Sequence, residues 1–361
     1  MALTLSGCAA PQQRPTGPAQ IQAWPPPPDE PRYYFERTLF SSMDVVEETS
    51  EDQFRRFATG EALTGRGLDK PFGVLAIDGR VFVGDTVSQQ VFVFDFPRRQ
   101  FYEFGQQGMG RLVQPLGMAA DRVGHIYVCD GSAHRINVYA LDGAYIKSVG
   151  SEELLENPSS VAVNSDGSRI YVVDTGRVDS DLHRVRVFDG DGRHLFDIGR
   201  RGPADGEFNL PLGAAVGPNG LLHVVDTGNF RVQVFSPDGH FLTKFGGIGR
   251  RPGNFAHPKG ITIDGEGKIF VTDTAFGNFQ IFDQSGRILM FVGNRNERGG
   301  PGQFVLPAGI TVDVDGRVYV VDQFFRKIDV FRPATLAATA PIGQPPGPAA
   351  VPIQETPPAA P

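Results

Sequence analysis

Six aspartates with the same surroundings are the side chains whose repetition in this sequence first suggests chemistry. Each follows a short apolar run and precedes a polar turn: Asp85, Asp130, Asp174, Asp226, Asp273 and Asp322. An arginine follows the turn in three copies, at Arg135, Arg184 and Arg231. A carboxylate at a strand end accepts hydrogen bonds from the following turn, and an arginine beyond it can return to pair with it. Because an active site needs one constellation rather than six, we interpret these pairs as structural hairpin clamps.

A second repeated motif lies upstream of every aspartate and indicates which elements position it. The motif is Pro-x-Gly, with prolines at Pro71, Pro115, Pro158, Pro211, Pro258 and Pro307, and Ser160 replaces the glycine in the third copy. Successive prolines are 43 to 53 residues apart, and each interval contains four short alternating apolar runs. This period predicts an all-β fold, a six-bladed β-propeller of four-stranded blades, rather than a solenoid of helices.

The fourth copy shows how one blade is expected to be built. Apolar runs at 213–216 and 221–226 are separated by Pro218-Asn219-Gly220, and a third run at 231–235 is followed by Pro237-Asp238-Gly239. Asn-Gly and Asp-Gly favour the positive φ angles of tight hairpins. The copy therefore predicts four antiparallel strands joined by short turns.

Composition agrees with one large all-β domain and argues against two classes of function. The chain has 361 residues with 45 Gly, 29 Pro, 28 Phe and one Trp. Its net charge of −7 argues against nucleic-acid binding, which requires a concentrated positive surface. The sequence shows no apolar run approaching the 18 or more residues that span a bilayer, so we expect no membrane helix.

The repeat resembles a known family. The stretches PKGITIDGEGKIFVTDT and DTGNFRVQVF are similar to the NHL repeat, and the resemblance covers residues 71–331 in six copies. It implies a six-bladed propeller. The copies depart from the repeat mainly at its basic position, where Gln90, Asn278 and Lys327 stand, and in the longer turn from Gly176 to His183.

The first residues resemble a bacterial lipoprotein signal. Leu5, Ser6 and Gly7 directly precede Cys8, the expected site of lipid attachment, although residues 1–8 lack a basic start and a full apolar region, as in a signal truncated at its start. Residues 9–31 are rich in Pro, Gln and Ala and predict a semi-rigid tether. By analogy, Ala9 favours the outer membrane, with the protein facing the periplasm. The other cysteine, Cys129, occupies a position held by valine or threonine in other copies and is expected to be buried.

Two terminal segments bear on how the ring closes. The sixth copy ends at Phe331 without a fourth strand, so the missing strand is expected from residues 32–60, which also contain a short helix beginning near Ser50. Residues 32–40 are our choice for this strand, and residues 54–59 are the alternative. The tail, residues 333–361, is rich in Pro and Ala and is predicted to be disordered.

Differences between blades are the expected source of function. The linkers between blades and the turns after the repeated aspartates share one face, where basic side chains gather on one side and Glu152, Glu153 and Glu156 on another. The basic set comprises Arg250, Arg251, Lys259, Arg295, Arg298, Arg326 and Lys327. A two-sided charge distribution suits an oriented partner. The main hypothesis is therefore a monomeric, lipid-anchored, non-enzymatic scaffold that binds another envelope protein or peptide and needs no cofactor.

Two other functions are consistent with the sequence. Six-bladed propellers related to the NHL repeat include metal-dependent lyases and lactonases, and the resemblance implies a zinc or calcium site at the axial mouth of the ring. His134, His183 and His257 fall on the linker side and are the candidate ligands, although none lies in a local metal-binding motif. Cytoplasmic peptide or RNA binding is a weaker third hypothesis, because it requires that Cys8 carry no lipid.

Overall fold

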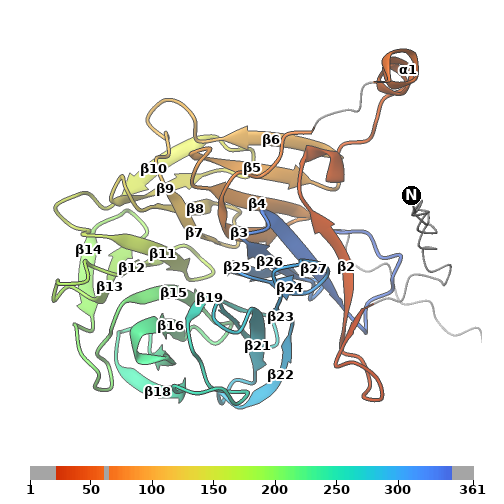
Figure 1. Ribbon diagram of the computed structural model, residues 1–361. Coiled ribbons are helices and arrows are strands. Elements are labelled where there is room, and N and C mark those ends of the chain that lie inside the picture. Colours follow the sequence, from red (N-terminus) through yellow and green to blue (C-terminus); the bar gives the residue numbers. More distant parts are fainter. Residues whose placement is uncertain (1–21, 61–64, 344–361) are drawn as a thin grey trace, which may run out of the picture.

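The computed structural model describes residues 22–60 and 65–343. The predicted signal with Cys8, most of the predicted tether and most of the predicted tail lie outside these residues. Within them the chain forms a six-bladed β-propeller, which confirms the predicted fold class (Figure 1). Among the described helices, none has the length and apolar character needed to cross a membrane.

The first three blades follow one another around the ring. Blade 1 consists of β3 (Pro71–Ile77), β4 (Arg80–Asp85), β5 (Gln90–Asp95) and β6 (Gln100–Phe104). Blade 2 consists of β7 (Pro115–Ala120), β8 (Ile126–Asp130), β9 (Arg135–Tyr139) and β10 (Tyr145–Val149). Blade 3 consists of β11 (Pro158–Val163), β12 (Arg169–Asp174), β13 (Arg184–Asp189) and β14 (His194–Ile198).

The next blades repeat this arrangement. Blade 4 consists of β15 (Pro211–Val216), β16 (Leu222–Asp226), β17 (Arg231–Phe235) and β18 (Phe241–Gly246), with a short 3-10 turn, η2 (Thr227–Asn229). Blade 5 consists of β19 (Pro258–Ile263), β20 (Ile269–Asp273), β21 (Asn278–Phe282) and β22 (Ile288–Val292). The linker to blade 6 contains the parallel pair β23 (Asn294–Arg295) and β24 (Gln303–Phe304). Blade 6 starts with β25 (Pro307–Val312), β26 (Val318–Asp322) and β27 (Lys327–Pro333).

Strand register explains why the two repeated motifs lie 14 to 16 residues apart in every copy. In every blade the first strand begins at the motif proline, and that proline pairs with the repeated aspartate at the end of the second strand, as in Pro211 with Asp226. Proline lacks an N–H donor and is tolerated at the first residue of a strand. The two motifs therefore lie side by side on the same face.

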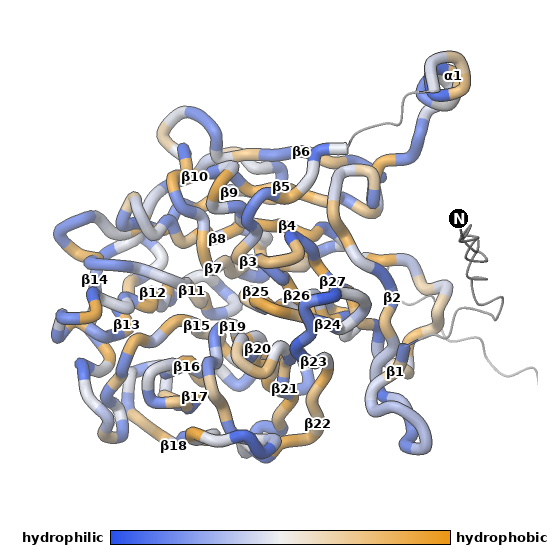
Figure 2. Tube along the Cα trace, viewed as in Figure 1, coloured by the Kyte–Doolittle hydropathy of each residue, from blue (hydrophilic) through white to orange (hydrophobic). Residues whose placement is uncertain are grey.

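The core lies between the blades. Hydrophobic stretches follow the strands, while much of the connecting loop is hydrophilic (Figure 2). Aromatic side chains at the ends of the third strands are all buried: Phe94, Tyr139, Phe188, Phe235, Phe282 and Phe331. Cys129 is also fully buried and packs in the cluster that joins blades 2 and 3. Each such cluster buries the apolar faces of two neighbouring sheets, so the blades stabilise one another in sequence.

The ring closes through the N-terminal segment. β2 (Tyr33–Leu39) pairs antiparallel with β27 and forms the fourth strand of blade 6, so the structure uses residues 33–39 rather than 54–59 (Figure 1). Arg317, which is fully buried, donates to Glu36 at 2.9 Å and to Asp315 at 2.8 Å. Thr38 donates to Asp329 at 2.7 Å. Polar contacts thus supplement the strand pairing at the closure.

Two predicted boundaries need correction. β1 (Ala23–Trp24) pairs with β2, and the Trp24 ring meets Phe331 edge-on at 5.2 Å between centroids, so the predicted tether joins the folded domain before residue 31. Downstream, the Ala340 carbonyl accepts a hydrogen bond from Arg317, and Ile342 is buried. The folded domain therefore extends past Pro333, where the tail was predicted to begin.

A short helix stands away from the blades. It is α1 (Ser50–Thr59), preceded by a 3-10 turn, η1 (Ser42–Asp44) (Figure 1). The N-cap is Thr49 rather than Ser50: its side chain accepts from the Asp52 N–H, and the Asp52 carboxylate accepts from the Thr49 N–H. Gly60 ends the helix with a φ of 70°. The helix predicted to begin near Ser50 is therefore present.

Candidate functional site

The six repeated aspartates lie on the face formed by the blade linkers and the second turns, here called the linker face. All six are fully buried, and each accepts a backbone hydrogen bond from one or both of the two residues before the motif proline of the same blade. The donors are the N–H groups of Asp69 and Lys70, Val113 and Gln114, Glu156 and Asn157, Asn209, Ala256 and His257, and Val305 and Leu306. The aspartates therefore anchor each linker at the start of a blade, a role that the sequence analysis missed.

Blade 4 contains the full predicted clamp. Asp226 accepts from Arg231 Nε at 2.8 Å and also from Asn229 and Gln233. Arg231 donates onward to the carbonyl oxygens of Ala204 and Glu207 in the linker. Burial raises the pKa of Asp226, while these donors favour its charged form and counteract the rise. The clamp thus joins turn and linker as well as the two strands.

The other two predicted clamps differ from blade 4. Arg184 lies 3.5 Å from Asp174 and pairs more closely with Asp197, at 3.0 Å. Arg135 instead donates to the Arg111 carbonyl at 3.1 Å, and its Nε is buried without a hydrogen-bond partner among the described residues. The shared Asp and Arg identities therefore do not ensure the same contact in each blade.

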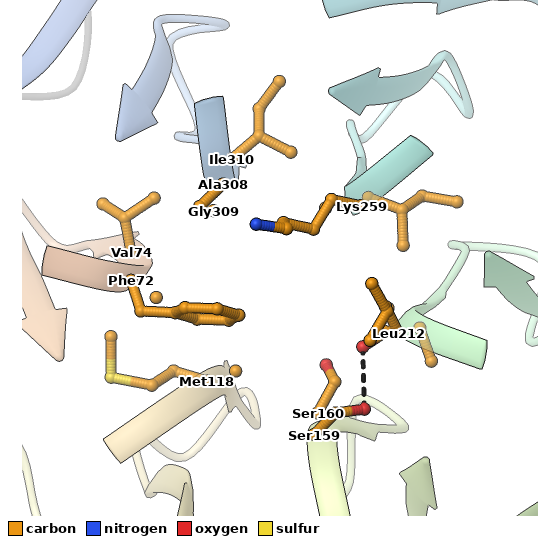
Figure 3. A pocket seen from close by; sticks show the side chains of 16 residues that line it. Phe72, Val74, Met118, Ser159, Ser160, Leu212, Lys259, Ala308, Gly309 and Ile310 are labelled. Atoms are coloured by element: carbon orange, nitrogen blue, oxygen red, sulfur yellow. Dashed lines mark hydrogen bonds between the residues drawn. The ribbon is translucent and has the colours of Figure 1, made fainter. Parts of the chain in front are cut away.

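The first strands of the six blades converge around the axis of the ring, where they line a small cavity, here called the axial mouth (Figure 3). Its volume is about 50 Å³. Residues after the motif prolines contribute Phe72, Ser159, Leu212, Lys259 and Ala308 to its lining, and blade 2 contributes Gly117 and Met118. The motif glycines permit this convergence, because a Cβ on Gly213 would lie 2.5 Å from the Lys259 carbonyl oxygen.

Lys259 carries the charge in the axial mouth. Its amine points into the open centre, 5.5 Å from the centroid of the Phe72 ring (Figure 3). Burial lowers the pKa of Lys259; the carboxylate of Asp322 opposes this change and the nearby positive charge of Lys70 adds to it. Lys259 was predicted to belong to the basic set on the face of linkers and turns, whereas in the structure its side chain points to the axis (Figure 3).

The remaining members of the basic set have different environments. Arg250, Arg251, Arg295, Arg298 and Arg326 are exposed to solvent. Arg295 donates to the carbonyl oxygens of Thr274 and Val305. Lys327 is only 3% exposed and donates to Gly300 and Asp329 at 2.8 and 2.7 Å, so it is not available to a partner. Within the basic set, the exposed positive charge is thus carried by five arginines.

The linker face also exposes apolar side chains. Large apolar side chains are exposed in its linkers and turns at Val87, Met109, Val113, Val178, Leu182, Ile248, Leu306 and Phe324. The acidic side of this face has exposed Glu152, Glu153, Asp179 and Asp181. Mixed apolar and charged groups around a rigid ring are typical of protein interaction surfaces.

The three candidate metal ligands have separate environments. His134 Nδ1 lies 3.1 Å from the Leu155 carbonyl oxygen. His183 is buried, with one ring nitrogen beside the Arg177 carbonyl and the other accepting from the Leu210 N–H. Burial, followed by the charge of Lys259, lowers the pKa of His257. Within residues 22–60 and 65–343, no group of three or more His, Cys, Asp or Glu side chains is arranged to hold a metal ion. The residues of the axial mouth, with one amine and no carboxylate or imidazole, do not fit zinc or calcium either.

His223 has a structural environment. It lies in β16 at a position where neighbouring blades have an aromatic ring, and it is 4% exposed. Its Nδ1 lies 3.2 Å from the Leu221 carbonyl oxygen. Burial lowers the pKa of His223 to about 4, so the side chain is neutral at physiological pH.

Comparisons with known proteins agree with this architecture. The family model for the NHL repeat matches residues 208–235, which contain the first three strands of blade 4. Together the fold and this match define the chain as a six-bladed β-propeller that contains the NHL repeat. A segment of 123 residues, 33% of this chain, is 31% identical to Protein brain tumor of Drosophila melanogaster, and the match spans only 11% of that protein.

Solved structures resemble the chain in fold. A streptogramin B lyase has a TM-score of 0.54 at 16% identity, with 73% of this chain and 94% of that chain covered. A gluconolactonase from Xanthomonas campestris has a TM-score of 0.56 at 17% identity, with 74% and 86% covered. A structural genomics protein of unknown function from Bacteroides thetaiotaomicron has a TM-score of 0.59 at 16% identity, with 75% and 71% covered. At these identities the similarity shows the fold alone.

Proposed function

We propose that this chain is a non-enzymatic scaffold that binds a protein or peptide partner on its linker face. The observation that carries this proposal is the size of the axial mouth. Its cavity is about 50 Å³, whereas sites for small molecules usually enclose about 300–1,000 Å³. The surrounding face is broad and exposes both apolar and charged side chains. These dimensions favour recognition of a macromolecular surface over enclosure of a small substrate.

The proposal includes a place for the scaffold in the cell. Cys8 carries a lipid that anchors the chain to the bacterial outer membrane on the periplasmic side. The order Leu5, Ser6, Gly7, Cys8 supports this part of the proposal. Incorporation of labelled palmitate that disappears in Cys8→Ser is the expected result, whereas equal labelling of both proteins, or labelling of neither, contradicts it.

A partner pull-down with charge variants tests the binding face. The full chain is used to recover partners from envelope extracts, alongside the double variant Arg250→Glu and Arg251→Glu. Arg193→Glu with Arg287→Glu is the matched control, because both residues lie in turns on the opposite face and the change in charge is the same. We expect only the first variant to lose the partner. Equal recovery by both variants contradicts a role for the basic side of the linker face.

The enzymatic alternative is a lyase or lactonase that acts at the axial mouth, and the structural relatives motivate it. Metal analysis separates the two functions. Stoichiometric zinc or calcium that is lost when His134, His183 and His257 are replaced would support the enzyme and contradict the scaffold.

A further inference from the structure

Two departures from the repeated motif meet in the axial mouth. Lys259 places an amine at a position held by Phe72, Leu116, Ser159, Leu212 and Ala308 in other blades. Ser160 stands where the other five copies have glycine, and its hydroxyl also lines the mouth (Figure 3). The axial mouth therefore combines one cationic group and a hydroxyl donor that the repeat itself does not provide.

The charge of Lys259 is not balanced at short range. Asp322 attracts it through space, but the oxygens of Asp322 already accept from four backbone N–H groups. Among the described residues, no carboxylate lies close enough to Lys259 to form an ion pair. The face of the Phe72 ring supplies the nearest compensation, at 5.5 Å. An amine in a partly buried, largely apolar opening gains more from an anion than an amine in water does.

The other hydroxyl in the opening has a structural partner. Ser159 donates its Oγ hydrogen to the Leu212 carbonyl at 3.0 Å, which ties blade 3 to blade 4 (Figure 3). Ser160 is therefore the serine that can donate to a ligand. An amine and a hydroxyl are both donors to the oxygens of a carboxylate.

We propose that the axial mouth captures one carboxylate group of a bound partner, which pairs with Lys259 and accepts from Ser160. This inference rests on the proposed function as a scaffold and names the chemistry of its partner. A cavity of about 50 Å³ admits a group as small as a carboxylate and excludes a sugar or a nucleotide. The group comes either from the C-terminus of the partner chain or from an Asp or Glu side chain.

Short peptides distinguish these two sources. The probes are Gly-Gly-Gly with a free C-terminus, its C-terminal amide, and acetyl-Gly-Asp-Gly-amide, each titrated into the full chain up to roughly tens of millimolar, the range of weak single-group affinities. The Gly260 backbone amide and the Lys259 side-chain signals in NMR spectra report occupancy. We expect a probe with a carboxylate to shift both signals, and the neutral amide to shift neither. The effective carboxylate probe identifies the source.

Variants of Lys259 establish that the signal arises from this site. Lys259→Met is expected to weaken carboxylate binding at least tenfold, Lys259→Arg to retain part of it, and Ser160→Ala to weaken it less. Lys268→Met is the matched control, because Lys268 has the same charge, lies in the same blade and is directed to the opposite face. Thermal unfolding of each variant checks that it folds.

The outcomes separate this inference from the proposed scaffold function. Three results would overturn carboxylate capture. They are equal shifts with the amide probe, no shift with either carboxylate probe, and unchanged binding in a folded Lys259→Met variant. If Lys259→Met recovers the partner from extracts as well as wild type does, capture fails and the scaffold stands. If carboxylate probes bind but no partner depends on Arg250 and Arg251, the mouth site stands and the proposed binding face fails.

Discussion

Two sets of six residues on the linker face, the repeated aspartates and the residues after the motif prolines, show opposite behaviour. The aspartates have the same identity in every blade and are fully buried. The residues after the prolines are Phe72, Leu116, Ser159, Leu212, Lys259 and Ala308, and five of them line the axial mouth. The strand register places the two sets only one position apart, so location alone does not explain the difference.

The hydrogen-bond partners of the two sets explain this difference. Each aspartate accepts hydrogen bonds from main-chain donors that are present in every copy whatever the local sequence, and its replacement leaves buried N–H groups unsatisfied. A residue after the proline instead faces an opening, where a change in side chain disrupts no hydrogen bond common to the blades. Repetition therefore marks the framework, and variation beside it marks the position where function can be specific.

Replacement of a repeated aspartate is expected to have the largest effect. Asp226→Ala leaves Arg231 buried without its carboxylate and removes the acceptor for the Asn209 N–H. We expect a loss of about 3–5 kcal/mol in the free energy of unfolding, measured by chemical denaturation. Asp238→Ala is the control, because this carboxylate is exposed and lies 3.5 Å from Arg169 at the surface, and it should cost under about 1 kcal/mol. Similar losses in the two variants would contradict the framework role.

Stability in acid extends the comparison between repeated and variable residues. His223 is buried in a blade, but other blades have an aromatic residue at its position. The pKa of His223 is about 4 in the folded state and 6.5 for the free side chain. The unfolded chain therefore binds more protons between these values, and the folded state loses up to about 3 kcal/mol as the pH falls from 6.5 to 4.

The variant His223→Phe introduces the residue that stands at the equivalent position, Phe270, in blade 5. It should remove this part of the acid sensitivity in denaturation curves at pH 7, 5.5 and 4. His240→Gln, at an exposed turn of the same blade, should leave the pH dependence unchanged. An unaltered slope in His223→Phe would show that another group causes the loss.

The motif glycines are expected to show an intermediate effect. A Cβ on Gly260 would lie 2.4 Å from the Ala308 carbonyl oxygen, so Gly260→Ala must move neighbouring main chain. We expect a loss of about 1–3 kcal/mol in thermal or chemical unfolding. Ser160→Ala at the equivalent position of blade 3 should cost less, because a side chain is already accommodated there. The reverse order would contradict convergence of the first strands as the reason for the glycines.

Lys259→Met should have the smallest effect on stability. Burial lowers the pKa of Lys259 below its ordinary value of 10.5. In the pH range between the two pKa values the unfolded chain binds more protons than the folded chain. The wild-type fold therefore gains stability as the pH rises through this range. The variant should be at least as stable at pH 7 and should lack this rise in alkaline denaturation curves. A clear loss of stability at pH 7 would place Lys259 in the framework rather than the functional set.

Much of the framework could be predicted from local patterns, whereas the contacts of individual charges could not. The period of the Pro-x-Gly motif and the aspartates predicted the six-bladed ring. Lys327 and Arg251 both belong to the predicted basic set, yet Lys327 is buried beside Asp329 and Arg251 is exposed. Arg135 and Arg231 occupy equivalent positions in their blades. Arg231 donates to its aspartate, Asp226, at 2.8 Å, whereas Arg135 donates to the Arg111 carbonyl. Such differences depend on linker paths, which vary in length from blade to blade.

By itself the sequence determined the elements that repeat, because strands, tight turns and their register depend on neighbouring residues and recur with each copy. It also determined that residues from the N-terminal segment had to complete blade 6. Tertiary structure decided the rest: that the aspartates anchor linkers, that β1 and the residues up to Ile342 join the folded domain, and that Lys259 and Ser160 share the axial mouth. The last two residues are far apart along the chain, and only closure of the ring brings their blades around one axis.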